Sequence, residues 1–438
     1  MVTILSSDNN TRREQEQHLA GCLLRGVRTG NTRAVKVMLE AGANVNGSDK
    51  VFHCGPLMFA VLLERIDIVD LLIRKGADVN IGTWEDVVED GVIVIPKRSR
   101  PLHAAVRACE MYIIRLLVLS GADVEATDAH GNTPLMAACN ASFESAASAR
   151  VDVARELLGA GADATSMNRD GGTALLFAAE YGDNVDLIDL LVSAAPATLN
   201  LADRARATPL LLAATNNKVN AVRHLLAAGA KQPAAARQPR TCPLARAVGE
   251  GHGDIVRILL DEEGVDAVIG GAKMMRHAVL AAVANKRVVI LQALLLWAEE
   301  KLGLWKEGLR IDGKPILNFA AACPDPATIG VLLAYGADEN EVDHAGNRPQ
   351  DMIEECVGGG PEVQKACRQV LERGPAYRAL SWAWPVGFIA RTETEARTPE
   401  LGVRYSKKQA ATRSTTFARL IDCYSAGPLG RKACFQRR

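Results

Sequence analysis

Cysteine and histidine are the residues of this sequence most able to ligate a metal ion or to act as nucleophiles. The chain has ten cysteines and eight histidines in 438 residues. No Cys-x-x-Cys pair occurs, and no two histidines stand at the spacing typical of a zinc site. Cys109, Cys139 and Cys323 fall at or beside small-residue positions of apolar helical stretches, where cysteine packs as a small hydrophobic residue. We therefore expect neither a bound metal nor a disulfide framework.

Sequence motifs that bind phosphate or carry out catalysis are also missing. Gly358–Gly360 is rich in glycine but lacks the lysine and the preceding strand of a phosphate-binding loop. Neither Gly-x-Ser-x-Gly nor His-Glu-x-x-His occurs. The many carboxylates lie in predicted helices, where they are usually solvated, and an open array of helices offers no closed pocket. We expect no cofactor and no enzymatic activity.

The stretch from Gly121 to Ala138 combines the end of one helix, a tight turn and the start of the next helix. Gly121 follows an apolar helical run and can adopt the left-handed conformation that ends a helix. Asp128–Gly131 has the composition of a tight turn. Thr133 offers a hydroxyl at the N-cap, and Pro134 suits the first helical position. The stretch predicts a joint between two helices.

This joint recurs along the chain with a period of about 33 residues, interrupted by insertions. Gly-Ala or a variant of it marks the ends of helices at Gly42, Gly76, Gly121, Gly161, Ala194-Ala195, Gly229, Gly264 and Gly336. Pro-Leu or a variant marks the starts at Pro56-Leu57, Pro101-Leu102, Pro134-Leu135, Ala174-Leu175, Pro209-Leu210, Pro243-Leu244 and Pro315-Ile316. Over residues 21–371 the pattern resembles the ankyrin repeat family, whose signature is Thr-Pro-Leu-His-x-Ala.

The resemblance implies an all-α ankyrin-repeat solenoid of helix-turn-helix units with short β-turn fingers. We divide the chain into a polar leader (1–18), an array of about nine to ten units (19–373, with an insertion at 81–99), a Trp-rich segment (374–390) and a basic, disordered tail (391–438). A second insertion, Ala141 to Arg150, is expected to be a loop. His103 matches the signature histidine and is expected to cap the turn. Arg206 replaces the glycine of its turn, which leaves the geometry of that finger open.

The distribution of charge bears on the partner. The chain is neutral overall, but residues 391–438 hold eleven Lys/Arg against four Asp/Glu, so the remainder is acidic by seven charges. Because phosphate contacts require clustered basic residues, we expect no direct binding of nucleic acid by the repeat array. No signal peptide and no apolar run of membrane-spanning length are apparent. We expect a soluble, intracellular monomer, cytoplasmic or nuclear, that does not enter membranes and binds another protein.

The insertion after the second unit is the most distinctive candidate for a binding element. Two β-favouring runs flank Asp90-Gly91, which predicts a hairpin that lengthens a finger. The family binds partners with its fingers and with the concave face of its first helices. The candidate residues on the finger are Trp84, Asp86 and Ile93, and those on the helices are Leu62, Leu63, Arg107, Asn140, Tyr181 and Asn216. In the alternative interpretation, Trp84 and the Val-Ile run fold back onto the neighbouring units.

These features favour a non-enzymatic interaction scaffold. Degenerate repeats and long insertions make the chain similar to ankyrin proteins of filamentous fungi, some of which regulate transcription. The alternative is a substrate adaptor for a ubiquitin ligase, although the tail shows no clear F-box or SOCS-box pattern. An enzyme with an unrecognised site is the third hypothesis.

Overall fold

The structure is a computed structural model that describes residues 18–47, 54–83, 85, 87–89, 92–95, 97–140, 147–231, 241–261, 272–299, 310–311, 314–355 and 360–374. The chain divides into two units, Met1–Trp384 and Pro385–Arg438, and all described residues lie in the first. Most of residues 1–18, the Trp-rich segment and the tail therefore lie outside the described residues. So do the expected joint at Gly264 and the side chains of Trp84 and Asp86.

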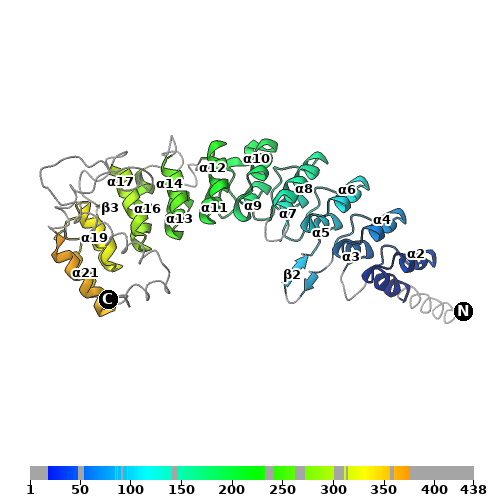
Figure 1. Ribbon diagram of the computed structural model, residues 1–438, viewed down its shortest axis with the longest axis horizontal. Helices are drawn as coiled ribbons and strands as arrows, with labels where there is room; N and C mark the ends of the chain where they lie inside the picture. Colours follow the sequence, from blue (N-terminus) through cyan, green and yellow to red (C-terminus); the bar gives the residue numbers. More distant parts are fainter. Residues whose placement is uncertain are drawn as a thin grey trace, which may run out of the picture. The chain divides into compact units, whose positions relative to one another are not determined.

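Two rows of helices make up the described unit (Figure 1). The first helix of each repeat packs against the first helices of the neighbouring repeats, and the second helices do the same among themselves. The first helices are residues 18–28, α3 (Pro56–Leu62), α5 (Pro101–Ala108), α7 (Pro134–Cys139), α9 (Ala174–Tyr181), α11 (Pro209–Thr215), α13 (Pro243–Glu250), α16 (Ala272–Ala284), α18 (Ile316–Ala322) and α20 (Pro349–Glu355). The second helices are α2 (Thr32–Glu40), α4 (Ile66–Arg74), α6 (Met111–Leu119), α8 (Ala147–Gly159), α10 (Val185–Ala194), α12 (Val219–Ala227), α14 (Gly253–Asp261), α17 (Val288–Trp297), α19 (Pro326–Ala334) and α21 (Pro361–Glu372).

The core lies between the two rows. In α6 the fully buried side chains Ile113, Ile114 and Leu117 follow helical spacing and face the first helices. In α5 the facing positions include Ala104 and Ala105, whose small size lets adjacent helices approach closely. This packing repeats from unit to unit, so the described residues form the all-α solenoid that the sequence predicts.

The joint at Gly121–Ala138 forms as expected. Gly121 has φ of +86° at the end of α6, and the Thr133 hydroxyl accepts a hydrogen bond from the Met136 N–H at 3.4 Å. Between them, the carboxylate of Asp128 accepts the N–H groups of His130 at 2.8 Å and Asn132 at 2.9 Å. These local bonds satisfy backbone donors that the turn would otherwise leave unpaired.

In the described ranges, five finger turns share one hydrogen-bond pattern, in which the N–H of the first residue bonds to the carbonyl of the last. These turns are Thr83–Ser99, Asp128–Asn132, Asn168–Gly172, Asp203–Ala207 and Asp343–Asn347. The strands are confined in the described residues to two short antiparallel pairs. One joins β1 (Val87–Glu89) to β2 (Val92–Ile95), and the other joins β3 (Arg310–Ile311) to β4 (Lys314–Pro315).

Two boundaries differ from the sequence-based expectation. Residues 147–150, expected in a loop, form the first turn of α8, whose alanines favour helix. The sequence predicts the seventh start at Pro315-Ile316, but α18 begins one residue later, at Ile316. Asn318 is the third residue of α18, as His103 is of α5, and it bonds the carbonyl of Asn347 just as His103 bonds that of Asn132.

The finger that carries Arg206 in place of glycine has the same turn geometry as the other fingers. The φ of Arg206 is +63°, the left-handed value that Gly131 adopts at the same place in an earlier finger with φ of +82°. The Asp203 carboxylate accepts the Ala207 N–H at 2.7 Å, so the turn closes in the usual way. A non-glycine residue in this conformation is strained by about 1 kcal/mol or more.

Replacing Arg206 by glycine is therefore expected to stabilise the protein by about 1 kcal/mol, because it removes this strain. Urea denaturation followed by circular dichroism measures the change. The matched control is Gly131→Ala, which should destabilise, since φ is +82° and an added Cβ would stand 2.9 Å from the Arg169 backbone nitrogen. A lower urea midpoint for Arg206→Gly would show that the arginine side chain has a stabilising role that outweighs the strain.

Candidate partner-binding surface

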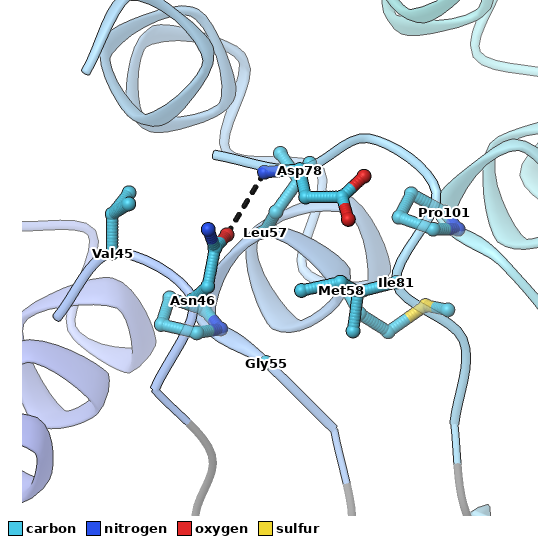
Figure 2. A pocket seen from close by; sticks show the side chains of 9 residues that line it. Val45, Asn46, Gly55, Leu57, Met58, Asp78, Ile81 and Pro101 are labelled. Carbon is cyan, nitrogen blue, oxygen red and sulfur yellow. Dashed lines mark hydrogen bonds between the residues drawn. The ribbon is translucent and has the colours of Figure 1, made fainter. Parts of the chain in front are cut away.

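Polar side chains at the base of the fingers tie each unit to the next. The side-chain oxygen of Asn46 accepts the Asp78 N–H at 2.8 Å, as Figure 2 shows. One unit further, the side-chain oxygen of Asn80 accepts the Asp123 N–H at 2.9 Å. Glu125 bonds Asp163 and Asn200 bonds Lys231 in the same way. These bonds between units set the spacing at which successive fingers stand.

The cavity beside the Asn46–Asp78 bond is too small for a ligand. It is lined by Val45, Leu57 and Ile81, among others, and has a volume of about 10 Å³ (Figure 2). That volume holds about one water molecule. In the residues that the structure describes, no group of three His, Cys, Asp or Glu side chains is placed to hold a metal ion. No described helix has the length and apolar character needed to cross a bilayer.

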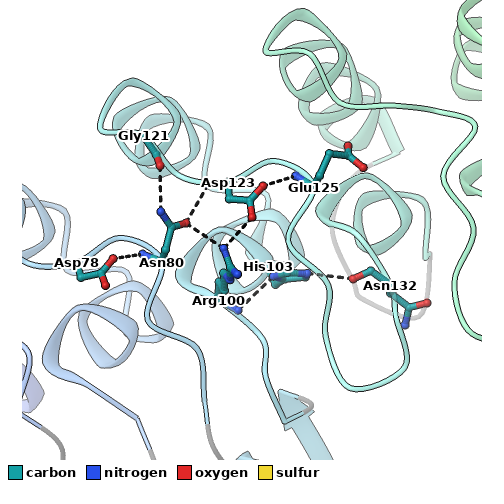
Figure 3. A network of polar contacts seen from close by, with 8 residues as sticks. All are labelled: Asp78, Asn80, Arg100, His103, Gly121, Asp123, Glu125 and Asn132. Atoms are coloured by element: carbon teal, nitrogen blue, oxygen red, sulfur yellow. Dashed lines mark hydrogen bonds and ion pairs between the residues drawn. The ribbon is translucent and has the colours of Figure 1, made fainter.

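Arg100 and His103 stand at the start of the third unit, where Arg100 reaches back to Asn80 of the second unit and His103 reaches Asn132 of the fourth (Figure 3). The Arg100 guanidinium donates to the Asp123 carboxylate at 2.9 Å. His103 is 2 % exposed; its Nδ1 accepts the Arg100 N–H at 3.2 Å, and its Nε2 lies 3.1 Å from the Asn132 carbonyl. These two contacts require a neutral ring with the proton on Nε2. Burial lowers the pKa of His103, which agrees with that state. The expected capping role is confirmed.

The insertion at 81–99 enters the tip of a finger turn rather than its base. The Thr83 N–H donates to the Ser99 carbonyl at 2.9 Å and the Arg98 N–H donates to the Thr83 carbonyl at 2.7 Å. The Asp128–Asn132 finger makes the equivalent bonds at 3.0 and 3.1 Å. The hairpin of β1 and β2 thus grows from an otherwise regular turn, and Figure 1 shows it on the side of the first helices.

The candidate residues on the helices lie at corresponding places. Leu62 and Leu63 end α3, Arg107 is in the last turn of α5, Asn140 and Asn216 follow α7 and α11, and Tyr181 ends α9. Because consecutive first helices pack side by side, these residues form one row. We call the surface that carries this row the first-helix face. Ile93 is in β2, and its side chain, like those of Trp84 and Asp86, is outside the description.

The environments along this row differ. Leu62 and Leu63 are half-buried, while Tyr181 is 38 % exposed and stacks on Phe177 with ring centroids 6.2 Å apart. Burial raises the pKa of Tyr181, and the neighbouring carboxylate of Glu180 adds to the shift. The phenol therefore stays neutral and donates its hydrogen bond to the Glu180 carboxylate.

The sequence-based candidates did not include the phenylalanines at the fourth residue of several first helices. Phe59 in α3 and Phe177 in α9 are half-buried there, and Phe319 in α18 is 41 % exposed. Aromatic residues make up only 4 % of the chain, so their placement on this face adds large apolar contact area. The signal available in the sequence was the phenylalanine two residues after Leu57 and Leu175.

A wider hollow lies on the opposite side, between the second helices α6 and α8. Its volume is about 690 Å³. The charged groups that line it are paired with one another, Arg115 with Glu156 at 3.0 Å and Arg155 with Asp152 at 2.7 Å. Such pairs leave little charge for a partner to recognise. The first-helix face with its hairpin is the better candidate site.

Comparison with known proteins identifies the family. The family model described as ankyrin repeats in three copies matches residues 143–235 and 195–270, and the model of the single ankyrin repeat matches residues 53–84 and 100–129. The chain is an ankyrin-repeat protein. The ankyrin repeats indicate a role in protein–protein interaction.

Among similar proteins are ankyrin repeat and SOCS box protein 6 of Homo sapiens, 37 % identical over 160 residues, and ankyrin repeat and SOCS box protein 11 of Homo sapiens, 33 % identical over 133 residues. The matches cover 36 % and 30 % of this ankyrin protein and 35 % and 36 % of those relatives. The chain thus spans about a third of the length of the relatives it matches. Palmitoyltransferase AKR1 of Lachancea kluyveri is 29 % identical over 203 residues, covering 46 % of the ankyrin protein and 25 % of the enzyme.

Proposed function

We propose that this ankyrin protein is a non-enzymatic scaffold whose protein partner contacts the hairpin finger together with the first-helix face of α3 and α5. The observation that carries the proposal is the position of the hairpin at the tip of the finger between these helices. Leu62, Leu63 and Phe59 lie half-buried on α3, and Arg107 lies on the adjacent α5. A partner that covers them would bury apolar area beside a cation, as the centres of many interfaces do.

Affinity purification followed by mass spectrometry tests the proposal. The variant Leu63→Asp places a charge on the face and is expected to reduce recovery of the main partner at least about tenfold, the effect of burying an unpaired charge at an interface. The matched control is Leu119→Asp on α6, since Leu119 is 86 % exposed on the other row of helices. Equal recovery with the two variants would place the partner on another surface.

Within this function, the resemblance to fungal ankyrin proteins favours a transcription coregulator. A sequence-specific transcription factor among the recovered partners would support that role, and chromatin association that depends on this factor would establish it. Recovery confined to proteins that never enter the nucleus would argue against it.

A ubiquitin-ligase adaptor is the second candidate, because the names of two relatives join ankyrin repeats to a SOCS box. As an adaptor the protein would hold its substrate on the first-helix face and contact the ligase through its C-terminal segment. Truncation after residue 373 should then remove ligase subunits from the purified complex and leave the substrate bound. Absence of any ligase subunit from the complex of the full chain would contradict this role.

A further inference from the structure

The tips of four successive fingers are joined into one continuous surface. The Ala129 N–H donates to the Lys97 carbonyl at 2.8 Å, and the Arg169 N–H donates to the His130 carbonyl at 3.1 Å. Between the third and fourth fingers, the Arg204 N–H donates to the Asp170 carbonyl at 2.9 Å in the same way. Backbone bonds of this kind fix the fingertips relative to one another, so that side chains on them keep a constant spacing.

Basic side chains dominate this surface. Arg98, Arg169, Arg204 and Arg206 are exposed at the tips, and the structure gives none of them an ion pair within its described residues. His130 is exposed among them, and Lys97, also exposed, has an interaction of its own. The exposed acidic groups among the described residues of these four fingers are Glu85, which also has an interaction of its own, and Asp170.

The three short fingers carry two further acidic side chains, which are not exposed and whose carboxylates bond within the turns. Asp128 accepts backbone N–H groups of its own finger, and Asp203 accepts the Ala207 N–H at 2.7 Å. Among the exposed described side chains of the four fingers, five basic groups therefore stand against two acidic ones, on a repeat array that is acidic as a whole. A local row of this sign attracts negative charge to one place.

We propose that this basic fingertip row binds an acidic, extended segment of a protein partner. Neighbouring helices pack about 8–10 Å apart, and a polyproline II segment has about three residues per turn and advances about 3.1 Å per residue, so every third side chain faces the same side. One finger step thus corresponds to about three residues of peptide. The segment that fits carries an aspartate or glutamate at every third position, each facing one finger.

A protein segment fits this row better than a nucleic acid does. A second, acidic row lies at the base of the fingers. It consists of the exposed carboxylates of Asp78, Asp123 and Asp163. A uniformly charged phosphate backbone would meet this acidic row as well as the basic one, whereas a peptide can place its acidic residues over the tips alone. The inference deepens the proposed function, because it assigns a chemical class to part of the partner.

Fluorescence anisotropy with the full chain tests the inference. The probe is a labelled 15-residue peptide of the repeating unit Asp-Ser-Gly. Binding should weaken as salt rises, and the triple variant Arg169→Gln/Arg204→Gln/Arg206→Gln should weaken it about tenfold, as expected from three exposed charge contacts. The matched control, Arg33→Gln/Arg223→Gln/Arg257→Gln, removes the same charge from exposed positions on α2, α12 and α14 and should bind as the wild type does.

Two further comparisons complete the experiment: one varies the spacing of the aspartates in the peptide, and the other replaces the peptide by single-stranded DNA. A peptide with its five aspartates in one block should bind at least about threefold more weakly than the regular one. Absence of binding, an equal loss in the control variant, or tighter binding of a 15-nucleotide single-stranded DNA would each overturn the inference. Peptide binding measures the fingertip row, whereas partner recovery by a protein without the hairpin measures the proposed function, so failure of one is distinguishable from failure of the other.

Discussion

Replacing residues 84–96 by a single alanine is expected to abolish recovery of the main partner. The replacement leaves a five-residue turn from Thr83 to Ser99 with the length of the Asp128–Asn132 finger. The bonds that close the turn, from Thr83 to Ser99 and from Arg98 to Thr83, remain possible. Partner contact is lost because the deletion removes the hairpin and Trp84, the residue type most enriched among energetic anchors of interfaces.

The measurement is quantitative affinity purification of the full chain and of the shortened protein, with circular dichroism of both. Helicity and the thermal midpoint should be nearly unchanged, since the described residues among those deleted lie in a bend and two strands. Trp84→Ala is the finer variant, and Tyr112→Ala is its control, because Tyr112 is 59 % exposed on the outer face of α6. Undiminished recovery by the shortened protein would place the binding surface elsewhere along the first helices. A large fall in thermal midpoint would instead support the alternative that the finger packs onto its neighbours.

Replacing His103 by alanine is expected to destabilise the protein by about 2–4 kcal/mol. The substitution leaves the Arg100 N–H and the Asn132 carbonyl without their partner, and it opens a space at a site that is 2 % exposed. Because His103 joins two units, the loss should appear in the global unfolding transition. Urea denaturation at pH 7 measures it.

The same residue should make stability depend on pH. Its pKa is lowered in the folded protein, whereas the unfolded chain has the ordinary value of 6.5. The unfolded state therefore binds the proton more readily, so this contribution to stability is complete above pH 6.5 and decreases as the pH falls below it through the folded pKa. For this reason, the urea concentration at the unfolding midpoint of the wild type should decrease as the pH is lowered from 7 to 5.

His103→Asn is the matched control for both effects. Asparagine stands at the corresponding position of α18, where Asn318 donates to the Asn347 carbonyl at 2.8 Å. It can donate to the Asn132 carbonyl without titrating, so this variant should be more stable than His103→Ala and should lose the part of the pH dependence that belongs to His103. An unchanged pH dependence in His103→Asn would assign it to other groups.

Much of the fold could be predicted because its signals are local. Thr133, Pro134 and Gly121 each specify one step of a helix boundary through bonds within a few residues, and the structure shows those bonds. The hairpin of β1 and β2 was predictable for the same reason. The exact start of α18 was not, since the feature that identifies its register is the bond from Asn318 to a residue 29 positions away.

The candidate site was predictable only in part. The sequence indicated the row of helix ends from Leu62 to Asn216, because the family pattern gives every first helix the same phase. It did not indicate that Phe59 and Phe177 share that face, since exposure depends on how closely neighbouring units stack. The contacts of the hairpin side chains remain a prediction.

By itself, the sequence determined most of the helix boundaries, that the units repeat, and that one finger is long, because these features depend on backbone preferences within a unit. Tertiary structure alone decided how units are joined. Asn80 reaches Asp123, His103 reaches Asn132 and Arg169 reaches His130 only after the helices have stacked. Such bonds link residues about one repeat apart, and their geometry follows from the packing of side chains between units, which no local pattern specifies.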